Sequence, residues 1–287
     1  MNGARYELWI QSFALDASCY KRALPIIKAL KAAGYDGVEV PIFEGSPDHY
    51  SWLGEELDKL GLGRTTVSVL GAGQNPLSPD ASQRKAALTR TKWAIDCNSA
   101  LGSSLLAGPM HSELGYFSGA GATAQERKRG ISFHRAAGDY AAKQNVRFAL
   151  EALNRFEIYF LNTMEQLADY LDEVDHIAVK AMYDTFHSNI EEKNPVAAIK
   201  AIKRHMIHVH ISENGRGTPG RGHVPWAETY KGLKAAKYDG WMTIEAFGRS
   251  MPALAAATRV WRDFAPSKEQ VYQEGLKNMR QGWAQVN

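Results

Sequence analysis

Short apolar runs alternate with amphipathic stretches along the whole chain. Apolar residues spaced for one face of a helix predict helices in the amphipathic stretches, and the short runs are typical of buried strands. The runs predicted as strands are residues 7–13, 37–41, 65–70, 104–109, 146–153, 177–183, 206–211 and 241–246. The stretches predicted as helices are residues 20–33, 50–60, 82–100, 124–144, 163–174, 195–203, 225–236 and 252–264, followed by an extra C-terminal helix at 268–285.

Residues that favour helix ends lie at several of these boundaries. Gly34 and Gly61 supply C-terminal stops, and Ser82 and Thr163 are candidate N-caps. Asn194 precedes a proline, which is a favourable helix start. The end signals therefore support the alternation of strands and helices.

Eight strands, each followed by a helix, predict an α/β fold, namely a (β/α)₈ TIM barrel. A doubly wound open sheet is the alternative, and the count of eight favours the barrel. The strings LKAAGYDG at 30–37 and LKAAKYDG at 233–240 both lie at a helix-to-strand joint, which supports a repeating unit. Since no linker of Pro and Ser divides the chain, we expect one barrel domain over residues 1–287.

Composition narrows the class of protein. The chain has 287 residues, of which 45% are hydrophobic, enough for one large core. The net charge of +3 gives no polyanion-binding signature, so no nucleic-acid partner is expected. Only Cys19 and Cys97 occur, which indicates a reducing compartment. With no evident signal peptide or apolar stretch of roughly 20 residues, we expect a cytoplasmic protein without a membrane partner.

Four predicted strands in the second half end near an ionisable side chain that interrupts or follows apolar residues. A buried carboxylate at such a place is costly unless a cation meets it. Because strand carboxyl ends carry the chemistry of a (β/α)₈ TIM barrel, we interpret the four side chains as one metal site. They are Glu151, Asp184, His210 and Glu245.

Three carboxylates and one imidazole form a hard, mostly oxygen ligand set. This set favours a divalent cation, with Mn²⁺ first and Co²⁺ or Mg²⁺ as alternatives, and the absence of cysteine from it argues against structural zinc. The competing interpretation is that each residue is a separate polar group at a strand end. His208 lies two residues before His210 and points the same way, so we expect it one layer deeper, in a hydrogen-bonded supporting role.

The motifs around these residues resemble those of a known enzyme family. The strings ALEALNRFE, DTFHSNIEE, HVHISENGR, PGRGHVPW and IEAF are similar to the ketose 3-epimerases that act on D-tagatose, D-psicose (allulose) or L-ribulose. That family belongs to the xylose isomerase-like barrels of the sugar phosphate isomerase/epimerase superfamily. The resemblance is strongest over residues 146–247. In the first half of the chain it is weaker and rests mainly on the spacing of the predicted strands.

The resemblance implies roles for named residues. It assigns metal ligation to Glu151, Asp184, His210 and Glu245, and substrate contacts to Glu157, His187, Arg216 and Phe247. It also favours a homodimer or homotetramer. Glu157 and Arg216 lie in loops that follow ligand strands, and no glycine-rich phosphate cradle follows strand seven or eight, so we expect a free, unphosphorylated ketose as substrate. The alternatives are that Glu157 is a solvated loop acid, His187 a helix-start polar group and Arg216 a surface loop cation.

One departure from the family affects the sugar pocket. The family usually carries a Trp in the loop after the fourth strand, whereas this loop reads PMHSELGYFSGAG. His111, Tyr116 and Phe117 are the candidate replacements. The preferred sugar therefore stays open.

Epimerisation at C3 requires proton removal from one face of the sugar and proton return on the other. A divalent cation bound to O2 and O3 would stabilise the intervening enediolate. We expect Glu151 and Glu245 to act as acid and base on opposite faces and to exchange roles with the direction of reaction. Pure ligation without proton transfer is the alternative role for both.

Other functions are compatible with a similar barrel and metal set. They are an aldose–ketose isomerase, a keto-inositol dehydratase, an apurinic endonuclease and a non-catalytic sugar-binding protein. The near-neutral charge argues against the nuclease. Paired acids on the metal argue against a binding protein. A dehydratase acts as a lyase on a similar enediolate, so it is the serious rival.

Overall fold

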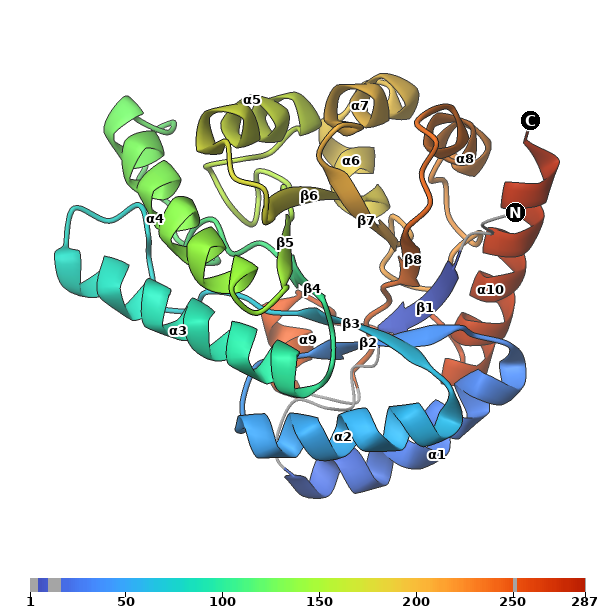
Figure 1. Ribbon diagram of the computed structural model, residues 1–287. Helices are drawn as coiled ribbons and strands as arrows, with labels where there is room; N and C mark the ends of the chain where they lie inside the picture. The colour runs from blue at the N-terminus through green and yellow to red at the C-terminus, as the bar shows by residue number, and fades with distance from the viewer. Residues whose placement is uncertain (1–4, 10–16, 250–251, 287) are drawn as a thin grey trace.

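The computed structural model describes residues 5–9, 17–249 and 252–286, and it describes their side chains except those of residues 6–9, 17–22 and 253. Eight parallel strands form a closed barrel in sequence order, because β1 pairs with both β2 and β8 (Figure 1). The predicted barrel is confirmed. The strands are β1 (Arg5–Trp9), β2 (Gly37–Pro41), β3 (Gly63–Val67), β4 (Leu105–Gly108), β5 (Arg147–Leu150), β6 (Val179–Asp184), β7 (Met206–Ile211) and β8 (Trp241–Ile244).

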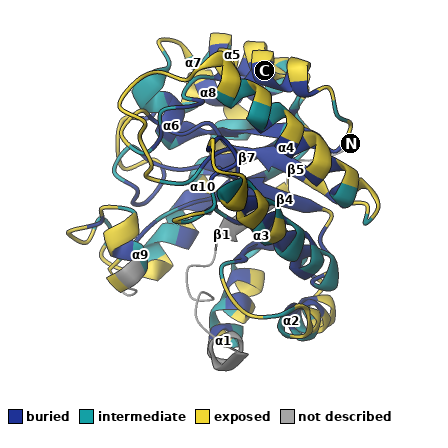
Figure 2. Cartoon of the chain, turned by 90° about the vertical axis from the view of Figure 1, so that its left-hand side faces the viewer, coloured by how far each residue is buried: buried dark blue, intermediate teal, exposed yellow. Residues whose placement is uncertain are grey.

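Helices surround the barrel, and their exposed residues face away from the buried strands (Figures 1 and 2). None of the described helices combines the length and apolar character needed to cross a bilayer. The helices are α1 (Ala17–Ala33), α2 (Pro47–Leu60), α3 (Ala81–Ala100), α4 (Ala124–Ala142), α5 (Met164–Val174), α6 (Thr185–Glu191), α7 (Pro195–Ile202), α8 (Trp226–Ala235), α9 (Pro252–Ala257) and α10 (Lys268–Gln285).

Several predicted boundaries need correction. Ser82 is not the cap of α3, because the Asp80 side chain accepts a hydrogen bond from the Ser82 backbone N–H and so starts the helix one residue earlier. The helix predicted at 252–264 ends at Ala257. Residues 10–13 of the first predicted strand lie outside the described part of the chain. Thr163 and Asn194 are confirmed as caps.

Helix α6 was not predicted from the sequence. It begins directly after β6, where the Asp184 side chain accepts hydrogen bonds from the backbone N–H groups of Phe186 and His187. The strand therefore ends in a carboxylate that also caps the next helix. Capping of this kind depends on hydrogen bonds from one polar side chain, and the pattern of apolar residues does not reveal it.

Alternation along the strands separates two apolar regions. Leu106 faces the surrounding helices within the large core, whereas its neighbours Leu105 and Ala107 belong to a smaller cluster inside the barrel with Met182. Beyond this cluster, in the direction of the strand carboxyl ends, the barrel interior becomes polar and contains buried Glu39 and His208. The barrel is thus filled by an apolar layer and then a polar one that leads toward the strand carboxyl ends.

Gly108 closes β4 in a conformation that favours glycine, with φ of +121°. A Cβ there would lie 2.3 Å from the Ser68 carbonyl oxygen, so no other residue fits without movement of the backbone. The Gly108 carbonyl accepts the backbone N–H of Glu151 at 3.2 Å. The glycine therefore helps to place Glu151 at the rim of the barrel.

Candidate active site

The four predicted metal ligands lie on neighbouring strands at one end of the barrel. All four are buried, with exposed fractions from 0% to 7%. Strand pairing places their positions side by side, and Asp184 and His210 are direct register partners. Glu151 follows β5, Asp184 ends β6, His210 lies within β7 and Glu245 follows β8.

The distances group these side chains around Asp184. His210 Nδ1 lies 3.6 Å from Asp184 Oδ2 and 3.6 Å from Glu245 Oε1. One potential ligand atom from each of these three residues lies within 4.8 Å of the others. By the same measure Glu151 groups with Asp184 and His187. The structure thus brings the four residues together, and His187 joins them on the Glu151 side.

Two buried atoms at the centre of this group have no hydrogen-bond partner. They are Asp184 Oδ2 and His210 Nδ1. The other Asp184 oxygen already accepts from two backbone N–H groups, and His210 Nε2 contacts Glu39 at 2.7 Å. An unsatisfied buried polar atom costs about 1–3 kcal/mol. A divalent cation with oxygen and imidazole ligands would satisfy both atoms, so the residues fit such an ion.

The pKa shifts of the three carboxyl groups also indicate that the site needs additional positive charge. Burial raises the pKa of Glu151 well above its ordinary value, and the nearby Glu245 carboxylate adds to the shift. Burial likewise raises the pKa of Glu245, to about 7, against the opposing effect of Arg216. Burial acts the same way on Asp184, but His210 and Arg216 outweigh it and lower the pKa of that carboxyl. The three acids therefore do not all ionise readily without a further cation.

Arg216 lies inside the site and not on the surface. Its guanidinium donates to Glu245 Oε2, and its Nη2 lies 3.0 Å from His187 Nε2. The same group stacks over the rings of Phe186, at 3.6 Å, and Phe247, at 4.8 Å. The interpretation of Arg216 as a surface loop cation is therefore wrong.

The loop that carries Arg216 is organised by a buried carboxylate. Glu213 accepts hydrogen bonds from the backbone N–H groups of Gly220 and Val224 and from the indole of Trp226. Arg216 itself adopts a φ of +57°, and its carbonyl accepts the backbone N–H of Phe247. The loop thus holds the guanidinium and the phenyl ring against each other.

His187 and Glu157 are linked through Asn154. The backbone N–H of Asn154 donates to His187 Nδ1 at 3.0 Å, and its side-chain amide donates to Glu157 Oε1 at 2.7 Å. Burial, aided by Arg216, lowers the pKa of His187 to about 4, so the imidazole is neutral at pH 7. Its Nε2 lies 3.7 Å from Glu151 Oε1. His187 is therefore inside the site, and Glu157 is half-buried at its edge.

Comparison with known proteins agrees with this architecture. The family model described as "Xylose isomerase-like TIM barrel" matches residues 27–282. A probable ketose 3-epimerase of Synechocystis sp. is 32% identical over 256 residues, covering 89% of each chain. A D-psicose 3-epimerase of Ruminiclostridium cellulolyticum is 31% identical over 280 residues, covering 92% of this chain and 89% of its own. The chain belongs to the ketose 3-epimerase family.

The solved structures give the same relationship in three dimensions. A D-allulose 3-epimerase from Methylomonas sp., in complex with D-allulose, superimposes with a TM-score of 0.89 at 26% identity, covering 98% of each chain. As a ketose 3-epimerase family member, the chain is an enzyme of the isomerase class. The resemblance recognised in the sequence motifs is thereby confirmed.

Glu39 of this ketose 3-epimerase family member was missed by the sequence analysis. It is fully buried in β2, and its two carboxylate oxygens lie 2.7 Å from the Nε2 atoms of His208 and His210. Thr65 also donates to it at 2.7 Å. Burial opposes its ionisation, but the two imidazoles outweigh burial and lower the pKa of Glu39. A carboxylate flanked by valines in GVEVP was the available signal.

The loop after β4 is also clearer in the structure. His111 is fully buried, and its Nε2 lies 2.8 Å from the carbonyl oxygen of Glu151. Tyr116 and Phe117 are 42% and 46% exposed. His111 therefore supports the backbone of Glu151.

Glu39 should set the cation affinity through the tautomer of His210. A Glu39 oxygen can only accept a hydrogen bond, so the ring proton of His210 lies on Nε2. This leaves Nδ1 of His210 free to bind a cation. In Glu39→Gln the amide NH₂ faces one imidazole, so we expect Mn²⁺ affinity to fall about 10–100-fold. Titration calorimetry measures the affinity, and ¹⁵N NMR of the histidine rings in metal-free protein reports the tautomer. Asp172→Asn, which alters the similar but exposed contact with His205, is the matched control. Unchanged tautomer and affinity in Glu39→Gln would contradict this role.

Cation binding should release protons. Glu245 has a pKa of about 7 before a cation binds, and the pKa of Glu151 is also raised, so both carry protons that a cation must displace. Affinity should therefore fall as the pH drops below about 7 and rise as it increases through that value. Calorimetry in buffers of different ionisation enthalpy should show release of about one proton or more per Mn²⁺ at neutral pH. Binding without proton release would refute the raised pKa values.

Proposed function

We propose that this protein epimerises free ketoses at C3, using a divalent cation and two glutamates. The observation that carries the proposal is the pair of buried carboxylates, Glu151 and Glu245, beside the unpartnered atoms of Asp184 and His210. The names of the relatives, which include D-psicose and L-ribulose 3-epimerases, support a ketose substrate.

The cation would be held by Glu151, Asp184, His210 and Glu245, with Mn²⁺ favoured and Co²⁺ or Mg²⁺ as alternatives. It would supply Lewis-acid stabilisation of the negative charge that develops on the substrate oxygens when C3 loses its proton. The resulting enediolate must then regain a proton on its other face.

Glu151 and Glu245 are the proposed proton carriers. They follow strands β5 and β8, which are not adjacent, so a sugar lying between them meets one carboxylate on each face. Their surroundings differ, because Glu245 accepts from Arg216 whereas Glu151 lies near neutral His187. One glutamate removes the C3 proton and the other returns one, with the roles exchanged in the reverse direction.

The remaining site residues would hold the sugar. His187 can present its Nε2 to a substrate oxygen, and Arg216 lies within reach of the same space. Glu157 would accept a hydrogen bond from a substrate hydroxyl at the edge of the site, and Phe247 would provide an apolar wall. A homodimer or homotetramer, a cytoplasmic location and a single domain over residues 1–287 stay predictions.

The function is tested by incubating the Mn²⁺-loaded protein with D-fructose, D-tagatose and L-ribulose and resolving the products. We expect the C3 epimer of at least one sugar, loss of turnover with a chelator, and recovery with Mn²⁺ or Co²⁺. An aldose product would indicate an isomerase, and a dehydrated product a lyase. A large preference in kcat/KM for a ketose phosphate, or full turnover by metal-free protein, would overturn the proposal.

The two-glutamate mechanism is tested with Glu151→Gln and Glu245→Gln. Each keeps an oxygen for the cation but loses the proton carrier, so turnover should fall by about 10²–10⁴-fold while Mn²⁺ affinity falls much less. Glu274→Gln, which alters an exposed ion pair with Arg221, is the control for removal of a glutamate charge.

Solvent deuterium separates the two half-reactions. A variant that exchanges the C3 proton of one epimer without forming product would assign the remaining carboxylate to that face. Near wild-type exchange of both epimers in both variants, with the cation still bound, would show that neither glutamate carries the proton.

A further inference from the structure

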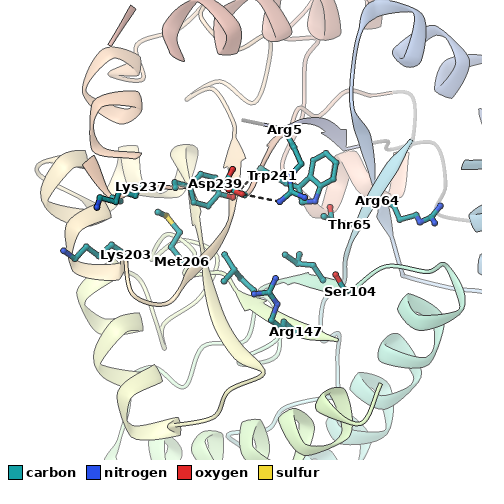
Figure 3. A pocket seen from close by; sticks show the side chains of 15 residues that line it. Arg5, Arg64, Thr65, Ser104, Arg147, Lys203, Met206, Lys237, Asp239 and Trp241 are labelled. Carbon is teal, nitrogen blue, oxygen red and sulfur yellow. Dashed lines mark hydrogen bonds between the residues drawn. The ribbon is translucent and has the colours of Figure 1, made fainter. Parts of the chain in front are cut away.

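A second cavity lies at the opposite, N-terminal end of the barrel. Its volume is about 300 Å³, and its wall includes Thr65, Leu105 and Met206 at the start of the barrel interior. Five cationic side chains and one carboxylate also line it (Figure 3): Arg5, Arg64, Arg147, Lys203, Lys237 and Asp239. Because the candidate active site lies at the strand carboxyl ends, this basic cavity is separate from it.

Two arginines face each other across the cavity. Arg5 and Arg147 are the first residues of β1 and β5, which are four strands apart and therefore on opposite sides of the closed barrel. Both side chains point inward in Figure 3. The Arg5 guanidinium stacks over Trp241 at 4.7 Å and donates to the carbonyl of Asp239, so its direction is fixed. The Arg147 side chain has no hydrogen bond or ion pair with any other described residue, which leaves its donors available.

The other cations contribute less directly. Arg64 turns away from the cavity. Outside it, the guanidinium pairs with Asp58 at 2.5 Å and donates to the carbonyl of Gly54. Lys203 and Lys237 lie at the rim with their ammonium groups directed outward. These lysines are exposed and without an acidic partner among the described residues, so they add positive potential at the entrance. Asp239 is the one carboxylate that opposes it.

We propose that this basic cavity binds a phosphate group, either free or carried by a small molecule. A guanidinium presents a planar fork of donors that matches two oxygens of an anion. Two forks approaching from opposite sides suit a phosphate, which offers at least three terminal oxygens and up to two negative charges near neutral pH. A carboxylate offers two oxygens and one charge, so it can occupy one fork well but not both. The volume admits a phosphate together with a short organic chain.

Binding is measured by titration calorimetry on the full-length, metal-loaded protein at constant ionic strength. The probes are inorganic phosphate, glycerol 3-phosphate and acetate. Saturable binding of phosphate, with acetate much weaker, is the expected result. Tighter binding of glycerol 3-phosphate than of inorganic phosphate would identify an organic phosphate as the ligand, and the reverse order would identify the free ion.

Variants separate this cavity from the cation of the candidate active site, which can also attract phosphate. Arg147→Gln should weaken phosphate binding roughly tenfold, because it removes charge-assisted hydrogen bonds. Arg5→Gln should act in the same direction, and both should leave ketose turnover unchanged. Arg262→Gln is the matched control, since that exposed guanidinium also stacks on an aromatic ring, Phe264 at 4.7 Å, but does not line the cavity. Absence of saturable phosphate binding, or equal affinity in wild type, Arg147→Gln and Arg5→Gln, would overturn the proposal.

Discussion

Repulsion among buried carboxylates is the constraint on which the site depends. Glu39, Glu151, Asp184 and Glu245 all lie within the barrel or at its rim, with at most 7% of each exposed. Buried like charges raise one another's pKa unless positive charge compensates them. The protein supplies part of that compensation through Arg216 and through the two imidazoles that face Glu39.

The compensation is divided between two layers. In the deeper layer, the two carboxylate oxygens of Glu39 contact His208 and His210, so both oxygens have a hydrogen-bond partner. In the outer layer, Asp184 Oδ2 and His210 Nδ1 keep no hydrogen-bond partner. His210 belongs to both layers, since one ring nitrogen contacts Glu39 and the other faces the acids. The polar interior of the barrel therefore prepares a place for a cation at the rim.

Charge is distributed unevenly along the barrel axis. The strand carboxyl ends gather acids, whereas Arg5 and Arg147 begin strands at the other end. An apolar cluster with Leu105 and Met182 lies between the two polar ends. Because the strands are parallel, the start and end of each strand consistently reach opposite ends of the molecule, and two chemically different sites can share one scaffold.

The sequence by itself determined the barrel, the order of its strands and the strand-end positions of Glu151, Asp184, His210 and Glu245. Those features are local, because apolar periodicity and the residue after a buried run are written in consecutive positions. Family motifs added His187, Arg216, Glu157 and Phe247 as candidates. The start of α3 and the existence of α6 depended on the short side chains of Asp80 and Asp184, which the apolar pattern does not record.

Only the tertiary structure decided which groups meet across the barrel. The pairing of Glu39 with His210 joins β2 to β7, residues separated by 171 positions in the chain. The burial of Arg216 depends on Phe186 and Phe247, which come from two other segments. The opposition of Arg5 and Arg147 likewise requires the barrel to close. Such contacts depend on strand register and closure, and no local pattern in the chain specifies them.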